Sequence, residues 1–209
     1  MTDPDRYLTV ADGPEAEIKV DRSRFVARLL HVEDEASAAE ALERVRRAHH
    51  AARHHGFALR IGAPGALRER ADDAGEPAGT AGRPILARLA RAGLHDALLV
   101  VSRYFGGVKL GTGGLSRAYG DAAQAALDAT PVEIVVLTTC LAIDCTYDDV
   151  GLVEAAVARA GSDVDAVTRE FTAGPRLVLR VRRSRANALS EAIVEATAGR
   201  ARVGVGVLG

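Results

Sequence analysis

The stretch Arg103–Tyr119, RYFGGVKLGTGGLSRAY, constrains the fold of this chain more than any other part of the sequence. The apolar run Ala97–Val101 precedes it, and such an unbroken run is typical of a strand covered on both faces. A glycine-rich loop spans Gly106–Gly114, and the spacing of apolar residues predicts a helix over Leu115–Asp128. A buried strand that leads through glycines into a helix indicates a fold in which helices pack on a sheet.

Further elements are expected before this stretch. Apolar residues recur at helical spacing after Asp34 and Ser37, and either of these two can cap the helix. Pro84 suits the first turn of another helix, which Gly93 ends. The remaining expectations for this block are strands at Glu15–Val20, Arg24–Val32 and Phe57–Ile61 and a polar loop at Gly62–Gly82.

The chain after Pro131 predicts the order β-α-β-β-α-β. Its expected elements are a strand Leu137–Tyr147, a helix Asp149–Ala160, a hairpin of Asp165–Phe171 and Arg176–Arg183 around Ala173-Gly174-Pro175, a helix to Ala198 that Ser184 or Asn187 caps and Gly199 ends, and a strand Arg200–Val207. This order is that of a ferredoxin-like domain. We therefore expect an α+β protein with two domains, residues 1–133 and 134–209.

The 209 residues carry nearly balanced charge, with 27 Lys and Arg against 28 Asp and Glu. This balance argues against general adhesion to nucleic acid or to an anionic membrane, but it is compatible with a local basic patch. The 48% of hydrophobic residues excludes collagen-like, disordered and disulfide-scaffold classes. All basic residues except Lys19 and Lys109 are arginine, so a lysine inside the glycine-rich loop is informative.

No segment predicts secretion or membrane insertion. The first residues lack the basic and apolar regions of a signal peptide. The most apolar stretch, Ile134–Ile143, is shorter than the roughly 20 residues that span a bilayer. Cys140 and Cys145 lie at an odd offset in one expected strand, on opposite faces, so they are not expected to form a disulfide. We expect a cytoplasmic protein without a metal or other cofactor.

The glycine-rich loop is the first candidate site, because a helix N-terminus offers unpaired N–H groups and partial positive charge to an anion. Its candidate residues are Arg103, Lys109, Gly111, Thr112, Gly113, Gly114 and Arg117. The pattern is neither a Walker A loop nor a dinucleotide fingerprint, since the lysine precedes the glycines. The glycines can equally serve only tight turns and close packing of the helix on the strand.

A second candidate is the acidic loop DDAGEPAGTAGRP, which begins at Asp72 and includes Glu76, Thr80 and Arg83. Paired carboxylates can perform acid–base chemistry or hold a divalent metal, but no further ligand stands at a recognisable spacing. A solvated turn is the alternative, in which Thr80 caps the helix near Pro84.

Four histidines fall within residues 49–55, and only His54, just before an expected strand, is retained as a site candidate. The glutamate of the HExxH zinc motif is missing, and an arginine stands at position 53. Neither cysteine lies at a basic helix start, and no Gly-x-Ser-x-Gly elbow occurs. We therefore assign no catalytic residue and no metal ligand.

In the second domain, Arg180 and Arg182 share one face of an expected strand, and Arg202 on the last strand can extend them into a basic stripe. RNA-binding sheets of this type stack bases on aromatic residues, and these two strands contain none. The stripe is therefore either a solvated face or a surface for phosphate contact.

Three motifs resemble those of the YigZ/IMPACT family in its bacterial two-domain form: SRF at residues 23–25, GEPAGTAGRPIL at 75–86 and RYFGGVKLGTGGLSRAY at 103–119. The resemblance implies a first domain like the second domain of ribosomal protein small-subunit five. It implies a second domain like the last domain of elongation factor G. Eukaryotic members of the family are translation regulators, and they act largely through an additional RWD domain that we do not expect in this chain.

Two departures from the family pattern affect the candidates. The usual Ser-Asp-Asp-Gly-Glu-Pro is replaced here by Asp72-Asp73-Ala74 before Gly75-Glu76-Pro77, which displaces one acid. The usual Ala-Ser-His-Asn-Cys-Tyr-Ala-Tyr keeps its histidine as His54 but has Gly56 at the cysteine. A thiol at that position is therefore not needed in this chain.

Two functions remain open. The first is a cytoplasmic, non-catalytic regulator that binds the ribosome, RNA or a translation factor through the glycine-rich basic face, without membrane binding or DNA sequence specificity. The alternative is a hydrolase-type enzyme for a small phosphorylated or peptide substrate between the two glycine-rich loops, with Glu76 and His54 as acid–base groups. A closed cleft in which these two side chains converge favours the enzyme, and an open basic face favours binding.

Overall fold

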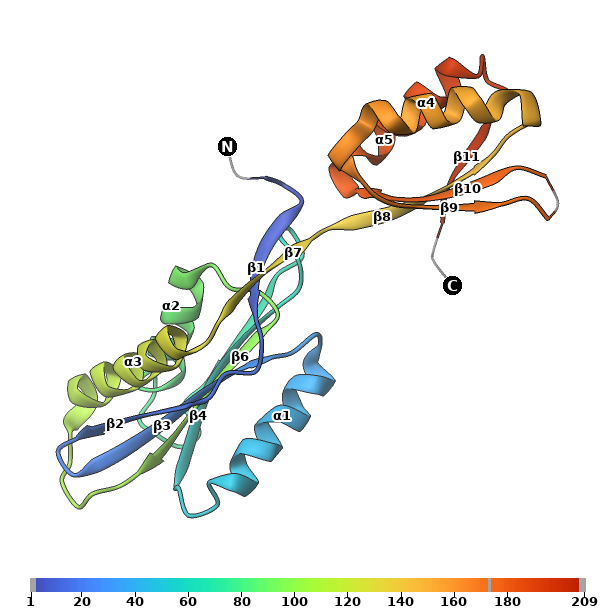
Figure 1. The fold of residues 1–209 in the computed structure, drawn as a ribbon. Coiled ribbons are helices and arrows are strands. Elements are labelled where there is room, and N and C mark those ends of the chain that lie inside the picture. The colour runs from blue at the N-terminus through green and yellow to red at the C-terminus, as the bar shows by residue number, and fades with distance from the viewer. Residues whose placement is uncertain (1–2, 173, 207–209) are drawn as a thin grey trace. The chain divides into compact units, whose positions relative to one another are not determined.

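The computed structural model describes residues 3–172 and 174–206. It consists of two compact units, each built from helices and strands (Figure 1). The N-terminal unit is Tyr7–Val135, and the C-terminal unit contains the described residues 3–6 and 136–206. The mixed class expected from the sequence is confirmed. The expected boundary after residue 133 falls inside a strand, β7 (Val132–Val136).

The N-terminal unit contains a five-stranded antiparallel sheet in the order β2-β3-β6-β4-β5. Its strands are β2 (Glu15–Val20), β3 (Ser23–His31), β4 (His54–Ile61), β5 (Arg68–Asp72) and β6 (Ala97–Tyr104). The edge strand β5 lies in the segment for which we expected a loop. All five of its residues are exposed, so it lacks the alternation of apolar and polar residues that identifies a half-buried strand.

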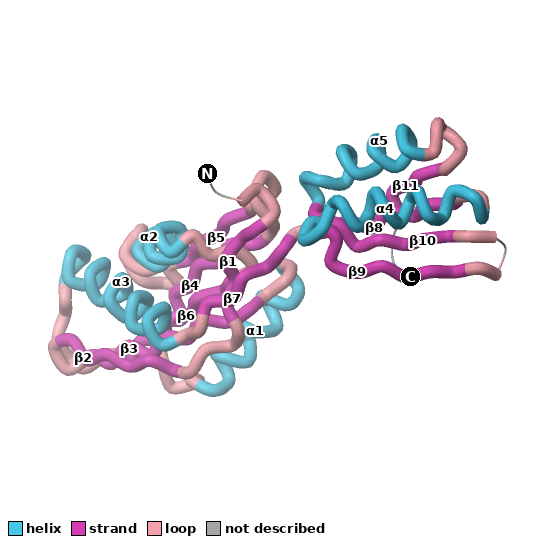
Figure 2. Tube along the Cα trace, turned by 45° about the horizontal axis from the view of Figure 1, so that its top comes forward, coloured by secondary structure: helices cyan, strands magenta, loops and turns pink. Residues whose placement is uncertain are grey.

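Helices cover both faces of this sheet (Figure 2). On one face lies α1 (Glu35–Ala48), which Asp34 and Ser37 begin with reciprocal side-chain bonds. On the other face lie α2 (Gly82–Ala92) and α3 (Gly111–Ala129). Along β6, Leu98 and Val100 pack in the cluster with α1, and Leu99 and Val101 pack in the cluster with α2 and α3. The unbroken apolar run of β6 therefore serves two cores.

A separate two-stranded sheet pairs β1 (Arg6–Val10) with β7. We expected neither strand. The apolar residues of β7 are Val132, Ile134 and Val136, and they are exposed. The pairing of β7 with β1 therefore buries no apolar face of β7 that a sequence pattern could identify.

The C-terminal unit has a four-stranded antiparallel sheet in the order β11-β8-β10-β9. Its elements are β8 (Thr138–Asp144), α4 (Val150–Ala160), β9 (Val164–Glu170), β10 (Arg176–Arg182), α5 (Ala186–Ala196) and β11 (Arg202–Gly206). Short 3-10 turns occupy Tyr147–Asp149, Gly161–Asp163 and Arg183–Arg185. Both helices pack on one face of the sheet. In the expected hairpin turn, Ala173 lies outside the described residues.

The expected caps of α5 are wrong. The helix begins after Arg185 without a side-chain cap, and neither Ser184 nor Asn187 performs that role. Ser184 instead donates its Oγ–H to the buried carboxylate of Asp5 at 2.6 Å, and its N–H bonds the same carboxylate. These bonds attach residues 3–6 to the C-terminal unit, which a local helix pattern does not predict. Within the described residues, no helix is long and apolar enough to cross a membrane.

Candidate functional site

One pocket of about 410 Å³ in the N-terminal unit brings six of the predicted residues together. These residues are His54, Glu76, Arg103, Lys109, Gly111 and Thr112. The sequence did not indicate the other lining residues, which are Arg53, Pro77, Phe105, Leu110 and Leu115. The pocket is therefore formed where the end of β6, the start of β4 and both glycine-rich loops meet.

The loop after β6 needs glycine at one position because it passes close to another turn. A Cβ on Gly106 would lie 2.0 Å from the carbonyl oxygen of Arg22, in the turn between β2 and β3. Gly111 begins α3 with a φ of +68°, a left-handed value that glycine adopts readily. Gly106 thus allows a close approach, and Gly111 allows the turn that starts the helix.

Two of the lining residues, Arg103 and Glu76, form a buried ion pair. The Nη1 of Arg103 donates to both carboxylate oxygens of Glu76, at 2.8 and 3.1 Å. The side chains are only 7% and 4% exposed. The hydroxyl of Tyr119 on α3 donates to Glu76 Oε1 at 2.9 Å. Glu76 is therefore occupied by two buried donors, so it is poorly placed to exchange protons with a substrate.

Tyr119 stays protonated in this arrangement. Burial raises the pKa of its hydroxyl far above the ordinary value, and the neighbouring carboxylate of Glu76 raises it further. A neutral phenol can continue to donate its hydrogen bond to Glu76 at any physiological pH.

Arg103 has N–H groups that take no part in its ion pair with Glu76. Its bonds to Glu76 leave from Nη1 alone, and within the described residues its buried Nε has no hydrogen-bond partner. The guanidinium carbon lies 5.6 Å from the ring centre of Phe25 and 5.5 Å from that of Phe105. Nε and Nη2 form one of the edges through which arginine can donate two parallel hydrogen bonds to an oxyanion.

The N-terminus of α3 is open toward the pocket. No side chain of the described residues caps the helix, and its first turn contains no acidic residue. Gly111 and Thr112, the first two helical residues, line the pocket, and their N–H groups have no partner within the helix. Lys109 and Arg53 are exposed and, among the described residues, pair with no carboxylate. The pocket therefore combines a positive helix end with two free cations.

Asp73, not Thr80, holds the start of α2. Its carboxylate accepts hydrogen bonds from the N–H groups of Gly79, Ala81 and Gly82 at 2.7–2.8 Å. Burial opposes ionisation, but these bonds and the charge of Arg83 hold the pKa of Asp73 below its usual value. The expected cap by Thr80 is wrong, because its hydroxyl instead donates to the carbonyl of Pro77 at 2.6 Å.

His54 is held by the acidic loop. Its Nδ1 lies 2.9 Å from the carbonyl oxygen of Ala74. Because a carbonyl can only accept, Nδ1 carries the proton in this bond and Nε2 is left as the other nitrogen of the ring. No hydrogen bond joins His54 to Glu76 within the described residues.

The remaining predicted residues do not line the pocket. Gly113 and Gly114 lie in the first turn of α3, and Arg117 is exposed on the next turn. Thr80 and Arg83 belong to the α2 start that Asp73 organises.

The three arginines of the expected basic stripe lie on the sheet of the C-terminal unit. Arg180 bonds Asp165 through Nε at 2.6 Å, and Arg182 bonds Asp3 at 2.6 Å. Arg202 of β11 stands in register with Asp144 of the neighbouring strand β8. Asp165 and Asp3 offset the charges of Arg180 and Arg182, so the stripe is a weaker candidate for phosphate contact than the pocket.

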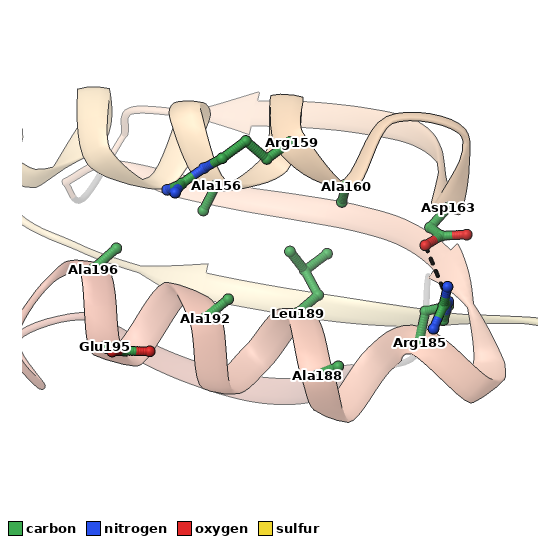
Figure 3. A pocket seen from close by; sticks show the side chains of 10 residues that line it. All are labelled: Ala156, Arg159, Ala160, Asp163, Arg185, Ala188, Leu189, Ala192, Glu195 and Ala196. Carbon is green, nitrogen blue, oxygen red and sulfur yellow. Dashed lines mark ion pairs between the residues drawn. The ribbon is translucent and has the colours of Figure 1, made fainter.

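A second hollow, of about 540 Å³, lies between α4 and α5 of the C-terminal unit. Figure 3 shows alanines of the two helices on its walls and the ion pair between Arg185 and Asp163 at one end. Short side chains at facing positions leave this space open.

Among the described residues, no group of three or more His, Cys, Asp and Glu side chains is arranged to hold a metal ion. Cys140 and Cys145 are both free.

The fold and the site define a mixed α/β protein of two units with a basic, anion-compatible pocket in the first. Residues 21–127, which include the whole pocket, match the family model described as the Impact N-terminal domain. The chain therefore belongs to the IMPACT family, and the resemblance seen in its motifs is confirmed.

Relatives extend this similarity over nearly the whole chain. An IMPACT family member of Haemophilus influenzae is 36% identical over 195 residues, which cover 93% of this chain and 94% of that protein. IMPACT family member YigZ of Escherichia coli is 39% identical over 138 residues, 66% of this chain and 68% of that protein. A crystal structure described as that of an hypothetical protein is 29% identical, covers 98% of both chains and has a TM-score of 0.67.

Proposed function

We propose that this protein is a non-catalytic, cytoplasmic regulator of translation that binds RNA, on the ribosome or in a ribosome-associated complex, through the pocket of its N-terminal unit. Family membership supports the association with translation, because the resemblance described above implies that eukaryotic members of the family are regulators of translation. The observation that carries the binding role is the convergence of Arg103, Lys109, Arg53 and the open N-terminus of α3 on one pocket.

The state of the carboxylate favours binding over hydrolysis. An acid–base mechanism needs Glu76 free to exchange a proton with a substrate. Glu76 is instead held by Arg103 and Tyr119, and His54 is held by the carbonyl of Ala74. Glu76 is thus committed to structural bonds. His54 keeps Nε2 open, but among the described residues no hydrogen bond links it to Glu76, so the pair that the enzyme hypothesis requires is not assembled.

The finer fold assignment is part of the same proposal. In the C-terminal unit, the order β-α-β-β-α-β, the strand order β11-β8-β10-β9 and the position of both helices on one face support a ferredoxin-like domain like the last domain of elongation factor G. For the N-terminal unit we retain the likeness to the second domain of ribosomal protein small-subunit five, which rests on the motifs.

The test uses the two lysines of the chain as a matched pair. Lys109→Ala removes an exposed cation of the pocket, and Lys19→Ala removes an exposed cation of β2 that pairs with Glu17 and does not line the pocket. We expect the unmutated protein to sediment with ribosomes and to bind ribosomal RNA at low salt. Lys109→Ala should weaken binding and lower the salt slope by about one unit, and Lys19→Ala should leave both unchanged.

The proposal fails if the unmutated protein neither sediments with ribosomes nor binds RNA at low salt. It fails equally if both lysine variants bind alike, because the pocket would then not be the contact surface.

A further inference from the structure

The geometry points to a nucleoside 5′-phosphate as the group that enters the pocket of the N-terminal unit, supplied either as a free nucleotide or as the 5′-phosphorylated end of an RNA strand. This inference rests on the proposed function, since it names the chemical group by which RNA would be held. Three features of the pocket carry it: donors without partners, a recessed position for the anion and an apolar wall beside it.

The donors come from two independent sources. The N–H groups at the start of α3 have no capping side chain in the part of the chain that the structure describes. The side chain of Arg103 is only 7% exposed, lines the same pocket, and has an Nε without a partner in the described residues. A buried donor that lacks a partner costs free energy, so a ligand oxygen at this edge would remove a penalty that the fold otherwise carries.

The charge of the pocket suits a phosphomonoester. Glu76 cancels the charge of Arg103 within their ion pair. Lys109 and Arg53 remain, so the pocket lining has two positive charges in excess. A phosphomonoester carries about −1.5 to −2 at neutral pH. A phosphodiester carries one negative charge and has chain on both sides, which hinders its approach to a donor as recessed as Arg103.

The apolar wall favours a nucleotide over other phosphate esters. Pro77, Phe105, Leu110 and Leu115 line the pocket beside the cationic groups. Phe105 is 48% exposed, although one side of its ring lies near the guanidinium of Arg103. An exposed aromatic ring next to a phosphate site is the usual platform on which a nucleobase stacks.

The direct test measures binding to the full-length protein by titration calorimetry at low salt. The probes are adenosine 5′-monophosphate, adenosine, O-phosphoserine, and a short oligoadenylate with either a 5′-phosphate or a 5′-hydroxyl. We expect adenosine to bind more weakly than adenosine 5′-monophosphate by about tenfold or more, the effect of losing charge-assisted hydrogen bonds. The 5′-phosphorylated oligomer should likewise bind more tightly than the 5′-hydroxyl oligomer.

Exposed positions provide variants that leave the core intact. Phe105→Ala should weaken binding of adenosine 5′-monophosphate about tenfold, the effect of losing one base stack, and should weaken O-phosphoserine binding less, because only the nucleotide has a base to stack. The matched control is Phe171→Ala, since Phe171 is 51% exposed in the C-terminal unit and lies outside the pocket. Lys109→Ala should weaken both phosphate probes, and Lys19→Ala neither. One buried variant, Arg103→Lys, keeps the charge but loses the Nε–Nη2 edge. With a native near-ultraviolet circular dichroism spectrum, it should weaken binding of both phosphate probes.

The outcomes separate this inference from the proposed function. If the 5′-phosphorylated oligomer binds more tightly than adenosine 5′-monophosphate, the source is an RNA end; if it does not, the source is a free nucleotide. Equal binding of the 5′-phosphate and 5′-hydroxyl oligomers, with no binding of the mononucleotide, overturns the inference but leaves RNA binding intact. Tighter binding of O-phosphoserine than of the nucleotide overturns it in favour of a phosphoprotein. Absence of an effect of Phe105→Ala overturns the stacking platform.

Discussion

Replacing Glu76 with glutamine tests the buried ion pair on which the pocket depends. Glutamine has nearly the shape of glutamate and can still accept the hydrogen bond of Tyr119, so Glu76→Gln chiefly removes the negative charge. The guanidinium of Arg103 would then stay buried without its counter-charge.

The size of the effect follows from the burial of the pair. Unit charges about 4 Å apart attract by about 4 kcal/mol at an effective dielectric constant of about 20. Breaking a buried pair by removing one partner costs about 3–5 kcal/mol of the free energy of unfolding. With a urea dependence of about 2 kcal/mol per molar, the unfolding midpoint should fall by about 2 M.

The assay is urea unfolding at neutral pH, followed by the near-ultraviolet circular dichroism of tyrosine. This signal reports mainly on the N-terminal unit, because Tyr119 is fully buried there and Tyr147 of the C-terminal unit is 69% exposed. The control is Glu17→Gln, which removes the partner of Arg24 in an exposed pair and should cost about 0–1 kcal/mol.

A double variant separates the charge effect from a loss of shape. Arg103→Met combined with Glu76→Gln leaves neither charge buried, so it should recover much of the stability lost in Glu76→Gln alone. The argument is refuted if Glu76→Gln is as stable as Glu17→Gln, or if the double variant is less stable than the two single effects added together.

Four further variants test other parts of the structure. Asp73→Asn should lower the free energy of unfolding by about 1 kcal/mol at neutral pH. Because the pKa of Asp73 is depressed in the folded state, its contribution is present above the unfolded pKa and lost as the pH falls through the folded pKa, so the variant and the unmutated protein should converge in urea titrations toward the acid end. Gly106→Ala should destabilise the protein by about 2 kcal/mol or more, since its Cβ would overlap the carbonyl of Arg22. Gly151→Ala in α4 should stabilise it by about 0.5–1 kcal/mol, because the added Cβ meets open space. Thermal unfolding that shows the same effect for both variants would contradict this geometry. Ser184→Ala should cost about 1–3 kcal/mol, measurable by far-ultraviolet circular dichroism in urea, because it leaves a buried carboxylate oxygen with fewer donors.

Local sequence patterns determined most of the secondary structure. The apolar run of β6, the capping pair Asp34 and Ser37 and the αL glycine that ends α2 are each recognisable within a few residues. These signals arise from hydrogen bonds and packing between near neighbours, which the sequence order specifies directly. The sequence did not predict β1, β5 and β7. β1 and β7 pair with each other across more than 100 residues, whereas β5 pairs with the neighbouring β4 but has only exposed residues and so no apolar alternation.

Part of the candidate site was also accessible from the sequence. Lys109, Gly111 and Thr112 adjoin a helix start, and the physics of helix ends identifies them without any tertiary information. Phe105 lies in the same motif, between Arg103 and the glycines of the loop. Its place at the start of this loop indicates that its ring could be exposed beside the helix start. Arg53, by contrast, reaches the pocket only because β4 begins beside the end of β6.

The sequence by itself determined that a buried strand leads through a glycine loop into a helix, and hence that a positive helix end lies near Lys109. Only the tertiary structure decided what the charged side chains around it do. Glu76 meets Arg103 from 27 residues away and Tyr119 from 43 residues away, and this pairing turns a candidate acid into a buried counter-ion. The physical reason is that the role of a carboxylate depends on the donors and the burial around it, and those are set by the packing of α2 and α3 on the sheet.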